Sequence, residues 1–196
     1  VLENRPEDCE ILVVLNQEYR DPYSLAGEIQ FVEAPRGASY IACAIAGIQY
    51  STSPVIHLLA SGCEVAEGWA DAALVLFANR LVGSVTPILY DRLHRDRVVA
   101  AGIGYSAGGR RRMIGRGLVQ AADVAGAAAL GPTSCAGFFR RSALEAAEGF
   151  CESLGLAADV DLALALQRAG WQTAVQRHSH VFTCTEVVLE EPGYRG

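Results

Sequence analysis

The segment 131–171 constrains the fold of this chain more than any other part, because it specifies two consecutive helices and the corner between them. Ser142 and Glu145 have the spacing of a capping box, in which a hydroxyl and a carboxylate satisfy backbone N–H groups at a helix start. We therefore expect a short helix over 143–148. Gly149 ends it, because glycine readily adopts the left-handed conformation of a helix C-cap.

A second helix is expected after a loop over 150–156. Its apolar residues between Val160 and Leu166 form a broad face, and Gly170 marks its end. Asp159 lies at or beside the first turn, where the helix dipole favours negative charge. A helix N-cap is therefore a sufficient structural explanation for Asp159.

At these residues the chain resembles the glycosyltransferase family 2 domain, which runs through Arg-Arg-Ser, a short helix, Gly-Phe, an acidic motif and a helix ending in Ala-Gly-Trp. The matching residues, in chain order, are Arg140, Arg141, Ser142, Gly149, Phe150, Asp159, Asp161, Leu162, Ala169, Gly170 and Trp171. With weaker matches upstream, the resemblance covers nearly the whole chain. It implies a GT-A-like α/β fold and an inverting sugar transfer, in which Asp159 is the general base that deprotonates the acceptor hydroxyl. Ala158 replaces the Glu that precedes this Asp in the family.

Upstream, short apolar runs alternate with helical patterns, which predicts an α/β domain with a mostly parallel central sheet flanked by helices. The first run, 10–15, is expected to be a strand covered on both faces. The other expected strands are 29–33, 55–59, 81–90, 97–101 and an edge strand over 173–184, and the expected helices are 38–49 and 66–79. The segment 102–117 is too rich in glycine and arginine for regular structure, and we expect a flexible loop there.

Composition narrows the classes of function. With 196 residues and 51% hydrophobic content, the chain is expected to form one domain over 1–196. A net charge of −6 disfavours nucleic-acid partners, and the absence of lysine excludes Schiff-base chemistry. The six cysteines include no C-x-x-C pair, which favours reduced, buried thiols and a cytoplasmic location. No apolar run reaches the roughly 20 residues that a transmembrane helix needs.

Ligands of such sheets gather where strands end. Asn16 follows the first expected strand, and Ser61 and Gly62 follow the third. Arg110 and Arg112, in the arginine-rich loop, can clamp a diphosphate or an acidic acceptor, or can simply form a solvated charged loop. We take all five as candidate residues for binding the nucleotide-sugar donor.

The family resembled places an Asp-x-Asp pair after the third strand, where it holds a divalent metal on the donor diphosphate. Here Ala60, Ser61 and Gly62 occupy those positions. Glu64 remains nearby, and His180 matches a histidine that the family often carries, so these two are the candidate metal ligands. Mn²⁺ or Mg²⁺ prefers several oxygen ligands, and we therefore expect weak metal binding or none. His57, inside an apolar run, is expected to be a hydrogen-bonded core residue.

Two functions remain open. The first is transfer of a sugar from a nucleotide-sugar donor to a glycan or other hydroxyl acceptor. The second is a catalytically inactive relative that serves as a glycan-binding or interaction module. The resemblance also implies a strand and helix ahead of 10–15 that form one wall of the nucleotide pocket. Either the chain was cut from a longer protein or this domain has lost part of its donor site. A nucleotidyltransferase would need a glycine-rich loop directly after the first strand, and none is present.

Overall fold

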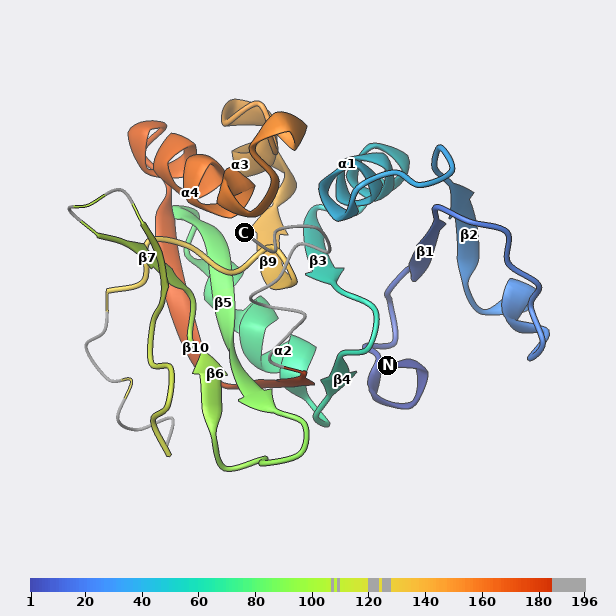
Figure 1. Cartoon of the computed structure of the whole chain (residues 1–196), viewed down its shortest axis with the longest axis horizontal. Helices are drawn as coiled ribbons and strands as arrows, with labels where there is room; N and C mark the ends of the chain where they lie inside the picture. The colour runs from blue at the N-terminus through green and yellow to red at the C-terminus, as the bar shows by residue number, and fades with distance from the viewer. Residues whose placement is uncertain (107, 109, 120–123, 125–127, 185–196) are drawn as a thin grey trace.

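The computed structural model describes residues 1–106, 108, 110–119, 124 and 128–184 (Figure 1). Its largest sheet has the strand order β3 (Val55–Leu59), β9 (Ala136–Arg140), β5 (Val82–Asp91), β10 (Gln172–Thr183) and β4 (Glu64–Val65), with β6 (Val98–Ala100) paired to β5. The expected α/β class is confirmed, but the expectation of a mostly parallel sheet is wrong. Only β5 and β10 pair in parallel in this sheet. β9 is antiparallel to both β3 and β5, β4 is antiparallel to β10, and β6 is antiparallel to β5.

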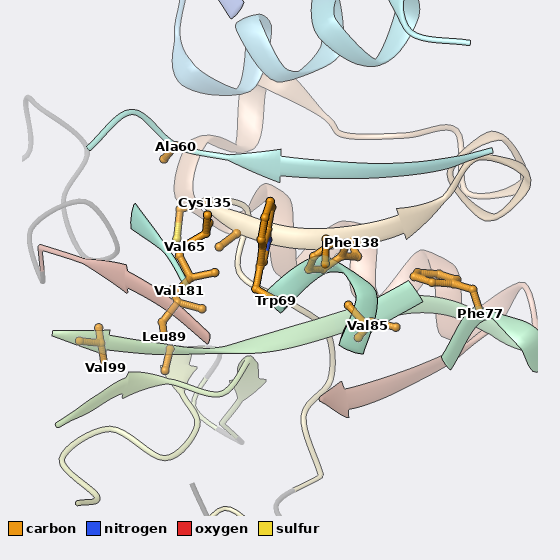
Figure 2. Packing of buried hydrophobic residues seen from close by; sticks show 14 of the residues in the cluster. Ala60, Val65, Trp69, Phe77, Val85, Leu89, Val99, Cys135, Phe138 and Val181 are labelled. Atoms are coloured by element: carbon orange, nitrogen blue, oxygen red, sulfur yellow. The ribbon is translucent and has the colours of Figure 1, made fainter. Parts of the chain in front are cut away.

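Helices cover both faces of this sheet. On one face, α2 (Trp69–Leu74) and the 3-10 helix η3 (Val75–Ala78) that continues it pack on β5 and β9, as Figure 2 shows for Trp69, Phe77 and Phe138. On the other face, Phe139 packs against α1 (Tyr40–Tyr50), α3 (Arg141–Ala146) and α4 (Ala158–Arg168). Neighbouring residues of a strand point to opposite faces, so Phe138 and Phe139 anchor the two layers.

The N-terminal strands stand apart from this sheet. β1 (Leu12–Leu15) and β2 (Gln30–Glu33) form a parallel two-stranded sheet of their own beside α1 (Figure 1). All four residues of β1 are partly exposed, so the expectation of a strand covered on both faces is wrong. A short apolar run predicts a strand that is at least partly buried, but it does not show whether one or both faces of the strand are covered.

The arginine-rich segment is more regular than its composition suggests. β7 (Ile103–Tyr105) and β8 (Arg111–Met113) pair as an antiparallel hairpin, which corrects the expected loop over 102–117. Glycine at position 104 of β7 allows Ile114 to pack closely, because a Cβ there would lie 2.8 Å from Ile114 Cδ1. Ala107, between the two strands, lies outside the described residues.

Two further local expectations need correction. β4 pairs with β10 only at Val181 and Phe182, so the expected edge strand is wrong at its C-terminal end, where β10 lies between β5 and β4. The helix α3 begins at Arg141, so Ser142 is an exposed residue of its first turn and not its cap. The Arg141 N–H donates instead to Pro54 O at 2.9 Å. The ends of the two helices agree with expectation, since Gly149 and Gly170 have φ of +72° and +86°.

Candidate functional site

Two adjacent arginines fix the frame around the site. Arg140 donates hydrogen bonds to the carbonyl oxygens of Val82 and Phe77, at 2.9 and 2.7 Å. Arg141 donates to those of Ser53 and Ser51, at 2.9 and 2.7 Å. These bonds satisfy carbonyls at the ends of helices and strands, where backbone partners run out. The Arg-Arg pair therefore holds the end of β9 against the elements on both sides of it.

Asp159 is the centre of the site. It lies in the first turn of α4, as expected, and is only 2% exposed. Arg111 Nε donates to Oδ1 at 2.9 Å and to Oδ2 at 3.1 Å, and Arg111 Nη2 also donates to Oδ2. The Ser134 backbone N–H donates to Oδ2 at 3.3 Å. Both carboxylate oxygens thus accept charge-assisted hydrogen bonds, which are the strong ones in proteins.

The segment before β9 connects Asp159 to the end of β3. Ala60 N–H donates to Cys135 O at 2.8 Å, while the neighbouring residue Ser134 bonds Asp159 through its N–H and accepts from Tyr40 Oη at 2.8 Å. The ends of β3, α1 and α4 therefore meet at residues 134 and 135. Burial raises the pKa of the Cys135 thiol to about 12, so this thiol is neutral at physiological pH and is a poor nucleophile.

The candidate donor residues occupy different surroundings. Asn16 Nδ2 donates to Ala38 O at 2.9 Å, so this side chain fastens the turn that leads into α1. Ser61 and Gly62 form an exposed turn directly after β3, where Gly62 has φ of +85°. Arg110 is exposed at the tip of the hairpin. Ser61 and Gly62 therefore lie next to Ala60, whose N–H bonds Cys135 O. The hydrogen bond of Asn16 gives this side chain a structural role.

Arg112 points away from Asp159. In β8 it follows Arg111, and alternate residues of a strand face opposite sides. Four arginines lie in this segment, and the sequence alone does not show that Arg111 is the one that pairs with Asp159, because the pairing depends on the register of the hairpin. If 111–113 is recognised as a strand, the alternation of its side chains places Arg111 on the opposite face from Arg110 and Arg112.

Glu64 and His180 lie on the adjacent strands β4 and β10, yet their side chains are engaged elsewhere. Glu64 pairs with Arg95 at 2.7 Å and with Arg92 at 3.7 Å. His180 Nε2 lies 2.7 Å from Arg177 O. Within the described part of the chain, no group of three or more His, Cys, Asp or Glu residues is placed to hold a metal ion. A single carboxylate held by two guanidinium groups does not fit the oxygen-rich coordination of Mn²⁺ or Mg²⁺.

His57 is a core residue, as expected. Its ring stacks on Phe138 with centroids 3.7 Å apart. Nδ1 donates to Gly137 O at 3.2 Å, which leaves Nε2 to accept from Trp69 Nε1 at 3.2 Å. Burial lowers the pKa of His57 to about 4, because the charged imidazolium loses its hydration. The ring is therefore neutral and structural.

Comparison with known proteins places the fold. No model of a protein family and no curated protein matches the sequence. Among solved structures, GalNAc-T7 with UDP, GalNAc and Mn²⁺ matches 89% of this chain and 37% of its own, with a TM-score of 0.68 and 11% identity. The mannosyltransferase PcManGT from Pyrobaculum calidifontis, with GDP-Man and Mn²⁺, matches 94% of this chain and 49% of its own, with a TM-score of 0.57 and 13% identity.

The chain therefore has the GT-A fold of these glycosyltransferases. It spans less than half the length of either matched protein. In the described residues, no helix is long and apolar enough to span a membrane.

Proposed function

We propose that this chain is a family 2-like glycosyltransferase that moves a sugar from a nucleotide-sugar donor to a hydroxyl acceptor with inversion. The observation that carries the proposal is the position of Asp159, the only buried carboxylate among the described residues. It lies on a GT-A fold and is linked through Ser134 and Cys135 to the end of β3. The two matched glycosyltransferases bind UDP with GalNAc and GDP-Man, which supports a nucleotide-sugar as donor.

The proposed chemistry needs one oxygen of Asp159 as a base. That oxygen takes the proton of the acceptor hydroxyl while the hydroxyl oxygen attacks the anomeric carbon, and the nucleotide diphosphate leaves from the opposite side. Both oxygens now accept hydrogen bonds from Arg111, so the guanidinium must release one of them first. A diphosphate suits the planar guanidinium fork as well as a carboxylate does. Donor binding therefore offers Arg111 a new partner and frees the base.

The donor is proposed to lie along the turn at Ser61 and Gly62, with Asn16 and Arg110 at its margins. The charge that develops on the leaving diphosphate is stabilised by guanidinium groups, of which Arg111 is the nearest to Asp159. The residues of this site do not fit a divalent metal, and the proposed steps involve only side chains of this chain.

A glycan-binding module without turnover is the second candidate. The observation that favours it is the complete engagement of Asp159, whose carboxylate is buried beneath Arg111 and leaves little room for an acceptor hydroxyl. The absence of carboxylates at Ala60, Ser61 and Gly62 points the same way.

Release of nucleotide diphosphate distinguishes the two candidates. The chain is incubated with UDP-, GDP- or dTDP-sugars and a panel of glycan acceptors, with and without Mn²⁺. We expect release from one class of donor, loss of release in Asp159→Asn, and retention of donor binding by that variant. Asp161→Asn is the matched control, because Asp161 lies on the same helix and is less buried. If no donor is consumed while glycans are still bound, the second candidate is correct.

A further inference from the structure

A pocket of about 420 Å³ opens between the β7–β8 hairpin, residues 128–130 and α4. Its volume lies within the range of small-molecule sites. Apolar side chains from Ile114, Leu130 and Leu164 form part of its wall, and Arg112 and Gln167 supply polar groups. No acidic residue lines it among the described residues, so its only formal charge is positive.

Strand β8 presents one arginine to Asp159 and the next one to this pocket. Arg111 faces the buried carboxylate, and Arg112 therefore faces the other side, where it lines the pocket. Gly104 is the partner of Arg112 across the hairpin, and Ile114 packs against it, since a Cβ at Gly104 would lie 2.8 Å from Ile114 Cδ1. Arg112 is exposed and forms no ion pair with any described residue, so its guanidinium is available to a ligand.

The pocket also has a defined place relative to the proposed base. Gln167 follows Asp159 on α4 by eight positions, which corresponds to roughly 12 Å along a helix. A ligand unit at the Gln167 end of the pocket is therefore too far from Asp159 to present the reacting hydroxyl itself. An extended chain anchored there by one unit can reach the base with another.

We propose that this pocket is an acceptor subsite for a sugar unit that carries a negative charge, such as a carboxylate or a sulfate. The proposal rests on the glycosyltransferase function proposed above and names the class of its acceptor. The aliphatic wall of Ile114, Leu130 and Leu164 packs against the C–H face of a pyranose ring. Arg112 pairs with the acidic group, and the Gln167 amide bonds ring hydroxyls. Arg112 is thereby assigned to the acceptor in place of the donor.

The test measures binding in the absence of any donor. Wild type, Arg112→Gln and Arg116→Gln are applied to an array of oligosaccharide pairs that differ only by a carboxylate or by a sulfate. Arg116 is the matched control, because it is an exposed arginine of the same segment that does not line the pocket. Melting curves confirm that each variant is folded.

We expect the wild type to prefer acidic over neutral members by about tenfold or more, which corresponds to one charge-assisted pair. Arg112→Gln removes this preference, Arg112→Lys restores part of it, and Arg116→Gln leaves it unchanged. The carboxylate and sulfate arms show which acidic group is recognised. Equal retention of acidic and neutral glycans by the wild type overturns the proposal. So does a loss of nucleoside diphosphate affinity in Arg112→Gln with glycan binding unchanged, because it returns Arg112 to the donor. Acidic glycan binding without any turnover keeps the subsite and refutes only the proposed transfer.

Discussion

Two carboxylates of this chain face arginine in opposite surroundings. Asp159 is 2% exposed and is held by Arg111, whereas the Glu64 side chain is 47% exposed and is shared by Arg92 and Arg95. Water and salt screen the exposed cluster, so pairs of that kind contribute about 0–1 kcal/mol. A buried carboxylate that loses its partner keeps its desolvation penalty, which makes the loss several-fold larger. Burial of the carboxylate, and not the number of its arginine partners, therefore determines how much an ion pair contributes to stability.

The largest expected effect comes from removing the partner of the buried carboxylate. Arg111→Met should lower the free energy of unfolding by about 3–5 kcal/mol, because Asp159 is then buried without a counter-charge. Urea denaturation measures this change. Asp159→Asn in the same chain should recover a large part of the loss, since a neutral amide is less costly to bury. Arg112→Met is the control and should change stability by less than about 0.5 kcal/mol. An equal effect of both arginine substitutions would contradict the comparison.

A buried neutral group should give the next largest effect. The unfolded chain protonates His57 below pH 6.5, whereas the folded chain keeps the ring neutral until the pH approaches about 4. Acid therefore favours the unfolded state, and the contribution of His57 falls as the pH drops from 6.5 towards 4, by up to about 3 kcal/mol. Urea midpoints of wild type and His57→Gln across this interval measure the effect. Parallel pH profiles of the two proteins would refute it.

The exposed cluster should respond weakly. Glu64→Gln is expected to lower the free energy of unfolding by less than about 1 kcal/mol, with a smaller loss at high salt. Thermal melts at low and high ionic strength provide the measurement. A salt-independent loss as large as that of Arg111→Met would show that Glu64 is effectively buried.

The smallest effect is expected at Ser179, whose buried Oγ has no hydrogen-bond partner among the described residues. Ser179→Ala should be neutral or slightly stabilising, because it removes an unsatisfied hydroxyl. Ser84 is the matched control: it is equally buried, but its Oγ lies 2.9 Å from Thr173 Oγ1. Ser84→Ala should cost about 1 kcal/mol, and calorimetric melting distinguishes the two. A larger loss at Ser179 than at Ser84 would reveal a partner of Ser179.

Local patterns in the sequence predicted much of this structure. The apolar face after Asp159, the glycines that end α3 and α4, and the hydrogen-bonded core role of His57 are all confirmed. Each depends on neighbours in sequence or on a single apolar run. The GT-A fold was expected from the Arg-Arg-Ser to Ala-Gly-Trp pattern, and comparison of structures supports it.

Features that depend on distant pairing were not predictable. β9 consists partly of small residues, and its antiparallel place between β3 and β5 is set by partners far away in sequence. The pairing of Arg111 with Asp159 depends on the register of the β7–β8 hairpin. The glycine-rich composition of this segment predicted a loop, so the hairpin was not recognised. The predicted cap at Ser142 is wrong because the helix begins at Arg141, whose backbone N–H bonds Pro54 O far away in sequence.

Titration calorimetry with UDP, GDP and dTDP, in EDTA and in Mn²⁺, tests whether guanidinium groups take the place of a metal at the donor diphosphate. If they do, one of these nucleotides binds with the same affinity in both buffers, and the chain alone binds Mn²⁺ weakly or not at all. Nucleotide binding that appears only with Mn²⁺, tight stoichiometric Mn²⁺ binding, or no nucleotide binding in either buffer would contradict this role of the guanidinium groups.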